Sequence, residues 1–344
     1  MSEQLTGTRK KVIVIVVPPD VQLMHAAGPC DVFTYTSKIL TGSPGFESGA
    51  YEVIMASTSK DLRVVSNSGM AVACSMSFAE IPLQIDTLII AGSSAVADME
   101  QINPDFYTWL TAVYPYVRRM VAICTGAFVL AKAGLLDHKT ATTHYEFCPV
   151  LKRSYPEIKV DTNPFFVKDG KVYTSGGVSS GINLSLALIE EDHGRDVALK
   201  VARKLVLELK RPGNQAQFSD FLPAYELKSA LVKNLRPWLM EHIAQEIKVE
   251  QMAEQANMSP RNFARVFLND TGLTPAKFIE KLRVEAARKY LENSDLSIEQ
   301  IAGLCGLGSM VSMRRVFLRH LEISPSYYRN SFQTALGQEL NLEI

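Results

Sequence analysis

The feature that most constrains the fold is a pattern that occurs twice near the C-terminal end, about fifty residues apart. One copy runs from Val249 to Pro275 and the other from Ile298 to Pro325. Each contains a short amphipathic segment, a turn, a second segment with an Arg-Val-Phe triplet, and a Thr-Pro or Ser-Pro pair that restarts a helix. Such a repeat predicts two helix-turn-helix units in tandem, joined by a helix that reaches about Asn293.

Candidate base-reading residues gather at the start of the second helix of the first unit. Ser259 is a suitable N-cap and Pro260 suits the first helical position. Arg261, Asn262 and Arg265 then share one face near the helix N-terminus, where a helix in the major groove contacts base edges. Because arginine pairs bidentately with guanine and asparagine with adenine, these three residues are predicted to read DNA sequence.

The second unit has a different set of side chains at the corresponding positions. Ser309 is the predicted cap, and Val311 and Ser312 occupy the places that Arg and Asn hold in the first unit. Arg314 and Arg315 follow, and both add positive charge. A valine and a serine form fewer hydrogen bonds, so this helix is expected to read fewer bases or to contact mainly phosphate.

These residues support a resemblance to a known family. Residues 226–332 resemble the DNA-binding domain of the AraC/XylS transcriptional regulators, in particular Ile-Ala-Gly-Leu-Cys-Gly-Leu-Gly-Ser at 301–309 and Ser-Pro-Ser-Tyr-Tyr-Arg at 324–329. The alternative, an ordinary helical domain with solvated arginines, is disfavoured by two matched copies. The resemblance implies a regulator, more often an activator, with double-stranded DNA as partner and RNA polymerase as a further candidate partner.

Composition sets the limits of this interpretation. A chain of 344 residues, 47% hydrophobic, suggests about two domains with substantial cores. The net charge is zero, but residues 225–332 hold 15 lysines and arginines against 12 acids, which permits DNA binding without proving it. The five cysteines show no C-x-x-C spacing, and the apolar run 12–17 is too short for a signal peptide or membrane span. We therefore expect a cytoplasmic protein with no membrane contact.

In the N-terminal two-thirds, apolar strands alternate with helices. Expected strands cover 12–17, 86–91, 120–123 and 171–174, and a helix is expected over 179–191. This order predicts a doubly wound α/β domain with a parallel sheet, in which a ligand sits beyond the carboxyl ends of the strands. Small-residue turns follow three of these strands and predict an effector pocket there. The candidate effector-binding residues are Gly92, Ser93, Cys124, Thr125, His144, Gly177 and His25.

Cys124 lies at a strand-to-helix turn, where a helix N-terminus is expected to lower the pKa of the thiol. With His144 nearby, it would form a nucleophile and base pair. The plainer alternative is a small residue at a tight turn. Cys148 follows His144 by four residues, but no further ligand is evident, so neither a metal nor another cofactor is expected.

Residues 10–210 resemble the PfpI-like branch of the class I glutamine-amidotransferase-like superfamily. The matching stretches are 22–33, 123–127, 134–137 and 141–144. Fusion to an AraC-type domain resembles the GlxA family of regulators, which implies a dimeric effector domain of flavodoxin-like fold and a nitrogen-containing effector such as an amino acid or a quaternary amine. The expected organisation is effector domain 10–210, linker 211–225, DNA-binding domain 226–332 and tail 333–344.

Two departures from the enzymes of this superfamily argue against catalysis. Enzymes such as isocyanide hydratases have an acidic residue where this chain has His25, and peptidase-like relatives have histidine where it has Thr125. An imidazole at position 25, which could be cationic, is a different acid from a carboxyl group. We therefore expect no enzyme activity, with Cys124, His144 and His25 as vestigial catalytic residues. The alternatives are a cysteine-dependent hydratase- or amidase-like enzyme and a redox sensor acting through Cys124.

Overall fold

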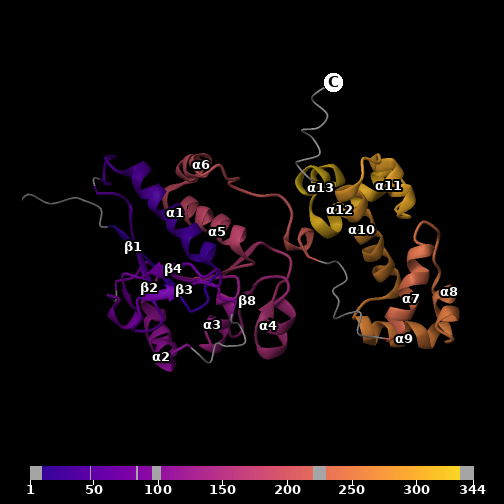
Figure 1. Cartoon of the computed structure of the whole chain (residues 1–344), viewed down its shortest axis with the longest axis horizontal. Helices are drawn as coiled ribbons and strands as arrows, with labels where there is room; N and C mark the ends of the chain where they lie inside the picture. The colour runs from indigo at the N-terminus through magenta and orange to yellow at the C-terminus, as the bar shows by residue number, and fades with distance from the viewer. Residues whose placement is uncertain (1–9, 47, 83, 95–101, 220–229, 334–344) are drawn as a thin grey trace, which may run out of the picture. The chain divides into compact units, whose positions relative to one another are not determined.

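The computed structural model describes residues 10–46, 48–82, 84–94, 102–219 and 230–333. The chain divides into two compact units, Met1–Arg211 and Pro212–Ile344 (Figure 1). The first is an α/β unit and the second is helical, and each is described by itself.

A seven-stranded sheet forms the centre of the first unit, with strand order β10-β11-β7-β6-β1-β2-β5. Its strands are β1 (Lys11–Val17), β2 (Tyr51–Ser57), β5 (Met76–Ser77), β6 (Thr87–Ile90), β7 (Arg119–Ile123), β10 (Phe166–Asp169) and β11 (Val172–Ser175). All neighbours are parallel except β10 and β11. Two small sheets pair β3 (Arg63–Val65) with β4 (Ala71–Ala73) and β8 (Thr140–Ala141) with β9 (Lys159–Val160). The predicted doubly wound α/β fold is confirmed.

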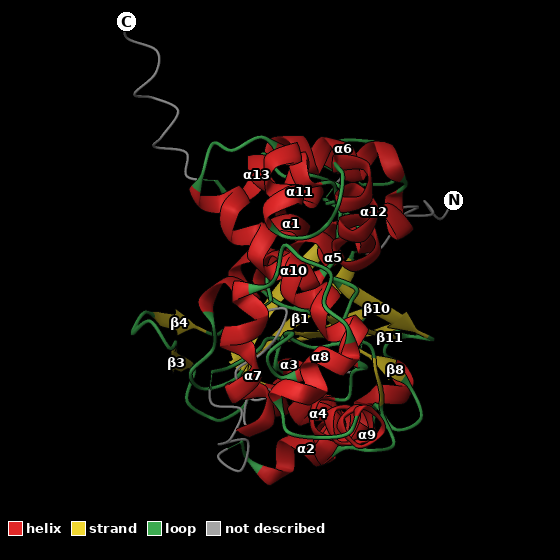
Figure 2. Ribbon diagram, turned by 90° about the vertical axis from the view of Figure 1, so that its right-hand side faces the viewer, coloured by secondary structure: helices red, strands yellow, loops and turns green. Residues whose placement is uncertain are grey.

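Helices cover both faces of this sheet (Figure 2). One face carries α1 (Leu23–Leu40), α5 (Val178–His193) and α6 (Arg195–Lys204). The other carries η1 (Phe78–Glu80), α2 (Pro104–Val113), η3 (Tyr114–Tyr116), α3 (Gly126–Lys132) and α4 (Cys148–Ser154). In β1, Ile13 and Ile15 belong to the first core, and Val14 and Val16 to the second. Burial on both faces explains why this strand is a continuous run of β-branched residues.

The second unit consists of two helical cores that share one helix. Its elements are η4 (Gln215–Gln217), α7 (Ala230–Glu241), α8 (Val249–Gln255), α9 (Pro260–Thr271), α10 (Pro275–Asn293), α11 (Ile298–Leu304), α12 (Met310–Leu321) and α13 (Pro325–Phe332). The first half of α10 packs with α7, α8 and α9, and its second half packs with α11, α12 and α13. The two predicted helix-turn-helix units are therefore α8–α9 and α11–α12.

Part of the segment expected as a linker, 211–225, is packed against the helical unit. The Asn214 side-chain amide donates to Glu322 Oε1 at 3.2 Å. The Arg288 guanidinium donates to the backbone carbonyls of Ser219 and Gln217 at 2.6 and 3.0 Å. This part of the expected linker is therefore held to the helical unit by part-buried hydrogen bonds. Residues 220–225 lie outside the described residues, as does the predicted tail from 334 onward.

Candidate effector site and DNA interface

Cys124 forms a sharp elbow between β7 and α3, and its backbone has a left-handed φ of 56°. Its N–H donates to the Ser175 carbonyl at 2.8 Å, and its carbonyl accepts from Thr143 Oγ1 at 2.7 Å. At Gly126 a Cβ atom would lie only 2.5 Å from the Ile90 carbonyl oxygen. The elbow is therefore held on both sides, and the glycine in it permits the close approach of β6.

The loop after β6 brings Gly92 and Ser93 beside this elbow, where they contact His25 of α1 and Thr125. The Gly92 carbonyl lies 3.1 Å from His25 Nδ1, and Thr125 Oγ1 donates to the Ser93 carbonyl at 2.7 Å. A Cβ on Gly92 would lie 2.8 Å from both His25 Nδ1 and Thr125 Oγ1. A larger residue at position 92 would therefore push these side chains apart.

His144 and Gly177 complete the cluster. The backbone of His144 forms a hydrogen bond with the Cys124 thiol. A Cβ on Gly177 would lie 3.5 Å from His144 Cδ2. The structure thus brings all seven candidate effector residues to one edge of the sheet, although their part in effector binding remains a prediction.

The electrostatics of the cluster differ from expectation. Burial raises the pKa of Cys124 to about 11, and hydrogen bonds from Thr125 and His144 offset this only in part. The expected lowering by the helix N-terminus is wrong, because α3 has only seven residues and Cys124 is 7% exposed. Burial also lowers the pKa of His25 and of His144. Of the two charge states that the sequence left open for His25, the lowered pKa favours the neutral imidazole near pH 7, and the same holds for His144.

Three buried polar atoms of this cluster have no hydrogen-bond partner in the described part of the chain: His25 Nε2, His144 Nδ1 and Ser175 Oγ. Glu146 Oε2 lies 3.7 Å from His144 Nδ1, beyond hydrogen-bond distance. Since a carbonyl can only accept, the contact with Gly92 places the His25 proton on Nδ1 and leaves Nε2 as an acceptor. Sequence reasoning missed Ser175, although it stands directly before the Gly176-Gly177 turn.

In the first helix-turn-helix unit, α9 presents the predicted base readers. Arg261, Asn262 and Arg265 are exposed. Arg265 Nη2 donates to Asn262 Oδ1 at 2.9 Å, so the two side chains support one another. Ser259 stands at the N-cap, but its side chain makes no capping hydrogen bond, which corrects the expected role of that hydroxyl.

The second helix-turn-helix unit has the predicted cap and the two predicted exposed arginines. Ser309 Oγ accepts from the Ser312 N–H at 3.3 Å, and Arg314 and Arg315 are exposed. Arg319, farther along α12, forms an ion pair with Glu280 of α10 at 2.9 Å. Arg319 therefore attaches α12 to the connecting helix.

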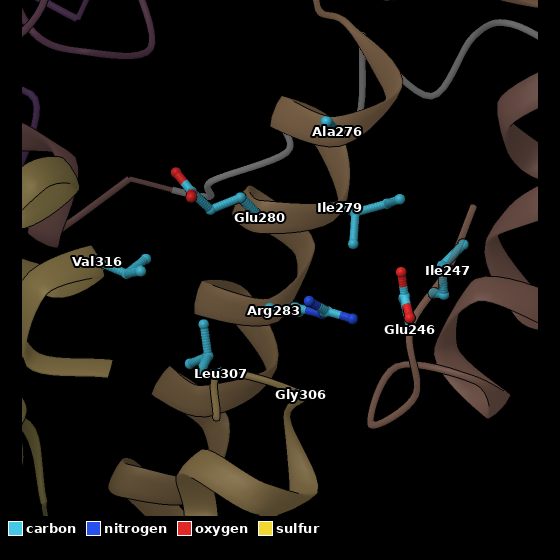
Figure 3. Close-up of a pocket in the computed structure, with 9 residues that line it drawn as sticks. All are labelled: Glu246, Ile247, Ala276, Ile279, Glu280, Arg283, Gly306, Leu307 and Val316. Atoms are coloured by element: carbon cyan, nitrogen blue, oxygen red, sulfur yellow. The ribbon is translucent and has the colours of Figure 1, made fainter. Parts of the chain in front are cut away.

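A pocket of about 330 Å³ lies along α10 between the two helix-turn-helix units (Figure 3). Its lining residues are Glu246, Ile247, Ala276, Ile279, Glu280, Arg283, Gly306, Leu307 and Val316. Arg283 donates to the carbonyls of Ile243 and Gln245 at 3.2 and 2.6 Å. Gly306, with φ 65°, lies so close to the Ile243 carbonyl that a Cβ would collide with it. The turn of the second helix-turn-helix unit thus contacts the loop before the first helix-turn-helix unit. The two units are therefore connected by this contact as well as by α10.

Five free cysteines accompany this arrangement. Within the described residues, no helix has both the length and the apolar character of a membrane span. The α/β unit with its elbow cluster, together with two reading helices on a shared scaffold, defines a DNA-binding transcriptional regulator with an added α/β domain.

Comparison with known proteins agrees with this class. The DJ-1/PfpI family model matches residues 10–191, and a helix-turn-helix domain model matches 252–331. The chain belongs to the DJ-1/PfpI family and carries an AraC-type helix-turn-helix domain, so the resemblance to GlxA-type regulators is confirmed.

Two relatives named as transcriptional regulators match about three quarters of this chain. Over 266 residues the chain is 29% identical to the HTH-type transcriptional regulator CdhR of Pseudomonas aeruginosa, covering 77% of this chain and 78% of that protein. Over 270 residues it is 28% identical to the HTH-type transcriptional regulator GlxA of Rhizobium meliloti, covering 77% and 81%. The structure of a THiJ/PfpI family protein from Pseudomonas syringae covers 61% of this chain and 80% of its own, with a TM-score of 0.50 at 19% identity. This last likeness supports the fold alone.

Proposed function

We propose that a small molecule bound at the Cys124 elbow controls DNA binding by this regulator and leaves the elbow chemically unchanged. The observation that carries the proposal is the burial of the thiol: Cys124 is 7% exposed, and this burial raises its pKa to about 11, which leaves little thiolate near pH 7. Nucleophilic attack requires the thiolate, and the lowered pKa values of the buried His25 and the half-buried His144 leave no imidazolium beside the thiol to stabilise that anion. A site that lacks an ionised nucleophile is suited to recognition rather than turnover.

The unpaired atoms of the cluster suggest the chemical class of the effector. His25 is 4% exposed and its Nε2 accepts, so a ligand must supply an N–H or O–H donor to satisfy it. Backbone N–H groups at the start of α5, directly after Gly177, suit a carboxylate. An amino acid or amide has both features. A quaternary ammonium group has no N–H, and a quaternary amine without a hydroxyl therefore lacks the donor, so this site favours the first of the two classes that the family resemblance implies.

The test is a screen of the full-length protein by thermal shift against amino acids, amides and quaternary ammonium compounds, followed by DNA-binding titrations with each hit. Cys124→Trp should abolish the effect of a hit while leaving basal DNA binding intact, because the filled space lies in the α/β unit. Cys124→Ser is the matched control and should keep the response. If the Ser variant folds and binds DNA normally but no longer responds, the thiol itself reacts and the binding-only proposal is wrong.

A second function, cysteine chemistry, is favoured by one observation. The left-handed φ of 56° at Cys124 is the strained turn that presents a nucleophile in hydrolase elbows. Turnover assays on small amides and nitriles would detect a hydratase or amidase, and peroxide-dependent DNA binding would detect a redox sensor. Neither signal is expected while the thiol remains protonated.

We also infer that the regulator acts as a homodimer in the cytoplasm, through residues 10–210, and activates transcription by contact with RNA polymerase. Dimerisation raises the effective concentration of the second DNA-binding domain once the first is bound. Sedimentation of the full chain at micromolar concentration tests the dimer, and transcription in vitro with purified polymerase tests activation. A monomer that binds its DNA with full affinity would contradict the first inference.

A further inference from the structure

The first turn of α12 exposes two large apolar side chains, directly after the Ser309 cap. Met310 is 50% exposed and Val311 is 63% exposed. Residues at the start of the second helix of a helix-turn-helix unit are the ones that contact base edges. The two exposed apolar side chains therefore lie at the part of the helix that faces DNA in a helix-turn-helix unit, not at an arbitrary surface position.

The corresponding turn of α9 has the opposite chemistry. It presents Arg261 and Asn262, which carry hydrogen-bond donors for purines. Met310 and Val311 carry no side-chain N–H or O–H, so they cannot take part in that kind of recognition. The two units therefore cannot read the same base pattern, even though their backbones follow the same plan.

A phosphate contact at this end of α12 is also disfavoured. Glu299 Oε2 accepts from the Met310 N–H at 3.0 Å, and Ser309 Oγ accepts from the Ser312 N–H. Two of the amide groups at the helix N-terminus are thus already satisfied, and a phosphate would meet the Glu299 carboxylate. The groups that the first turn of α12 can still offer to DNA are therefore the apolar side chains of Met310 and Val311.

We propose that Met310 and Val311 read thymine through its C5-methyl group, so that the second half-site is selected by apolar contact and the first by hydrogen bonds. The proposal rests on the DNA-binding function. The thymine methyl is the apolar group that the major groove displays, and contact with it distinguishes thymine from cytosine. The exposed Arg314 and Arg315, farther along the same helix, supply the positive charge that holds the duplex.

The experiment uses full-length protein and a duplex selected by it from a random library. Uracil replaces thymine in one half-site at a time, which removes the methyl groups and preserves base pairing. Affinity should fall about fourfold for each contacted methyl in the second half-site, the equivalent of one buried methyl group. Substitution in the first half-site should have a smaller effect.

Protein variants, each measured with the thymine and the uracil duplexes, complete the test. Met310→Ala with Val311→Ala should bind thymine and uracil duplexes alike, whereas Val311→Thr, which keeps one methyl, should retain part of the preference. Met240→Ala, on α7 and 39% exposed, is the matched control for loss of an exposed apolar side chain and should behave like the parent. Unchanged binding of the first half-site verifies that the variants are folded.

The outcomes separate this inference from the DNA-binding function. If no duplex is selected, DNA binding fails and the inference falls with it. If a duplex is selected but uracil substitution in the second half-site has no effect, DNA binding stands and methyl reading is wrong. Full uracil sensitivity in the double alanine variant would also overturn it, because the methyl contact would then belong to other residues.

Discussion

Glu280 on α10 and Arg319 on α12 form an ion pair with an N–O distance of 2.9 Å. The same carboxylate lies 2.6 Å from His320 Nε2. Burial raises the pKa of Glu280, but hydrogen bonds with His320 and Arg319 outweigh it, and the net pKa is lowered. The second reading helix is thus attached to the connecting helix by a charged contact that the sequence repeat does not reveal.

Glu280→Gln should lower the free energy of unfolding by about 1 kcal/mol, since the group is partly exposed and screened. Binding of the second half-site should weaken more than binding of the first. Because the folded-state pKa is lowered, this stability is present above the unfolded value of about 4.5 and is lost as pH falls through the folded value. Urea denaturation at pH 7 and pH 4 measures it, with Glu254→Gln on α8 as control. Equal losses of stability in Glu280→Gln and Glu254→Gln would contradict a specific role for the contact between Glu280 and Arg319.

Arg261→Ala or Arg265→Ala should reduce specific DNA binding by roughly 1–3 kcal/mol and relax the preference at one or two base pairs. Loss of a phosphate contact would weaken all sequences about equally, so the two roles are distinguishable. Base-substitution titrations with each variant make the measurement. Arg203→Ala, an exposed arginine of α6, is the control. Parent-like binding by both variants would show that α9 does not read bases.

Asn262→Ala should cost more specificity than Ser312→Ala, because a carboxamide reads adenine bidentately and a hydroxyl does not. The loss of Asn262 also removes the partner of Arg265. Arg315→Ala should reduce affinity more than Ser312→Ala does. Footprinting should show half-sites about one helical turn apart. A base-substitution scan in which the second half-site dominates would reverse this ranking.

The α/β unit contains a buried ion cluster at the edge of the sheet where β1 and β7 begin. The Asp192 carboxylate is 2% exposed and lies 2.9 Å from Lys11 Nζ and 2.9 Å from Arg119 Nη2. It also accepts from the Tyr51 hydroxyl at 2.7 Å. Burial raises the pKa of Asp192, but hydrogen bonds from Tyr51, Arg119 and Lys11 outweigh it and hold the pKa well below its usual range.

Asp192→Asn should destabilise the α/β unit by about 3–5 kcal/mol, because it leaves the buried Arg119 guanidinium without its main partner. The lowered folded-state pKa means that this stability is present above the unfolded value of about 3.8 and is lost as pH falls below it. Urea denaturation followed by Trp109 fluorescence in a Trp238→Phe background reports on this unit. Asp137→Asn, an exposed residue of the same unit, is the control. A loss below 1 kcal/mol would show that the cluster is readily solvated.

The Cys124 thiol should be alkylated slowly near neutral pH. A pKa of about 11 against 9.0 for an ordinary thiol lowers the thiolate fraction roughly a hundredfold. Since the folded-state pKa is raised, the associated stability is present below pH 9 and is lost as pH rises through 11. Iodoacetamide labelling at several pH values, with peptide mass spectrometry and urea-unfolded protein as reference, tests this. Equal labelling of folded and unfolded protein would contradict a buried thiol.

Local patterns in the sequence predicted the fold and the residues that cluster at the Cys124 elbow. Periods of two and 3.6 residues mark strands and helices directly, so the run 12–17 and the helix over 179–191 correspond closely to β1 and α5. Turn residues such as Gly92 and the Cys124-Thr125-Gly126 elbow follow strands, and parallel topology brings strand ends together. For the same reason, the repeat alone indicated two helix-turn-helix units and the exposed face of α9.

Properties that depend on distant neighbours were decided by the tertiary structure alone. The pKa of Cys124 is raised because packing excludes water from the elbow, an effect that outweighs the local helix terminus. Arg319 is paired because α10 presents Glu280 beside it, and the amides of 214–217 are packed because the helical unit offers partners. Asp192 is charged although buried, since Lys11 and Arg119 come to it from two separate strands. Sequence spacing specifies which atoms are available, whereas desolvation and charge pairing depend on which atoms the fold brings within a few ångströms.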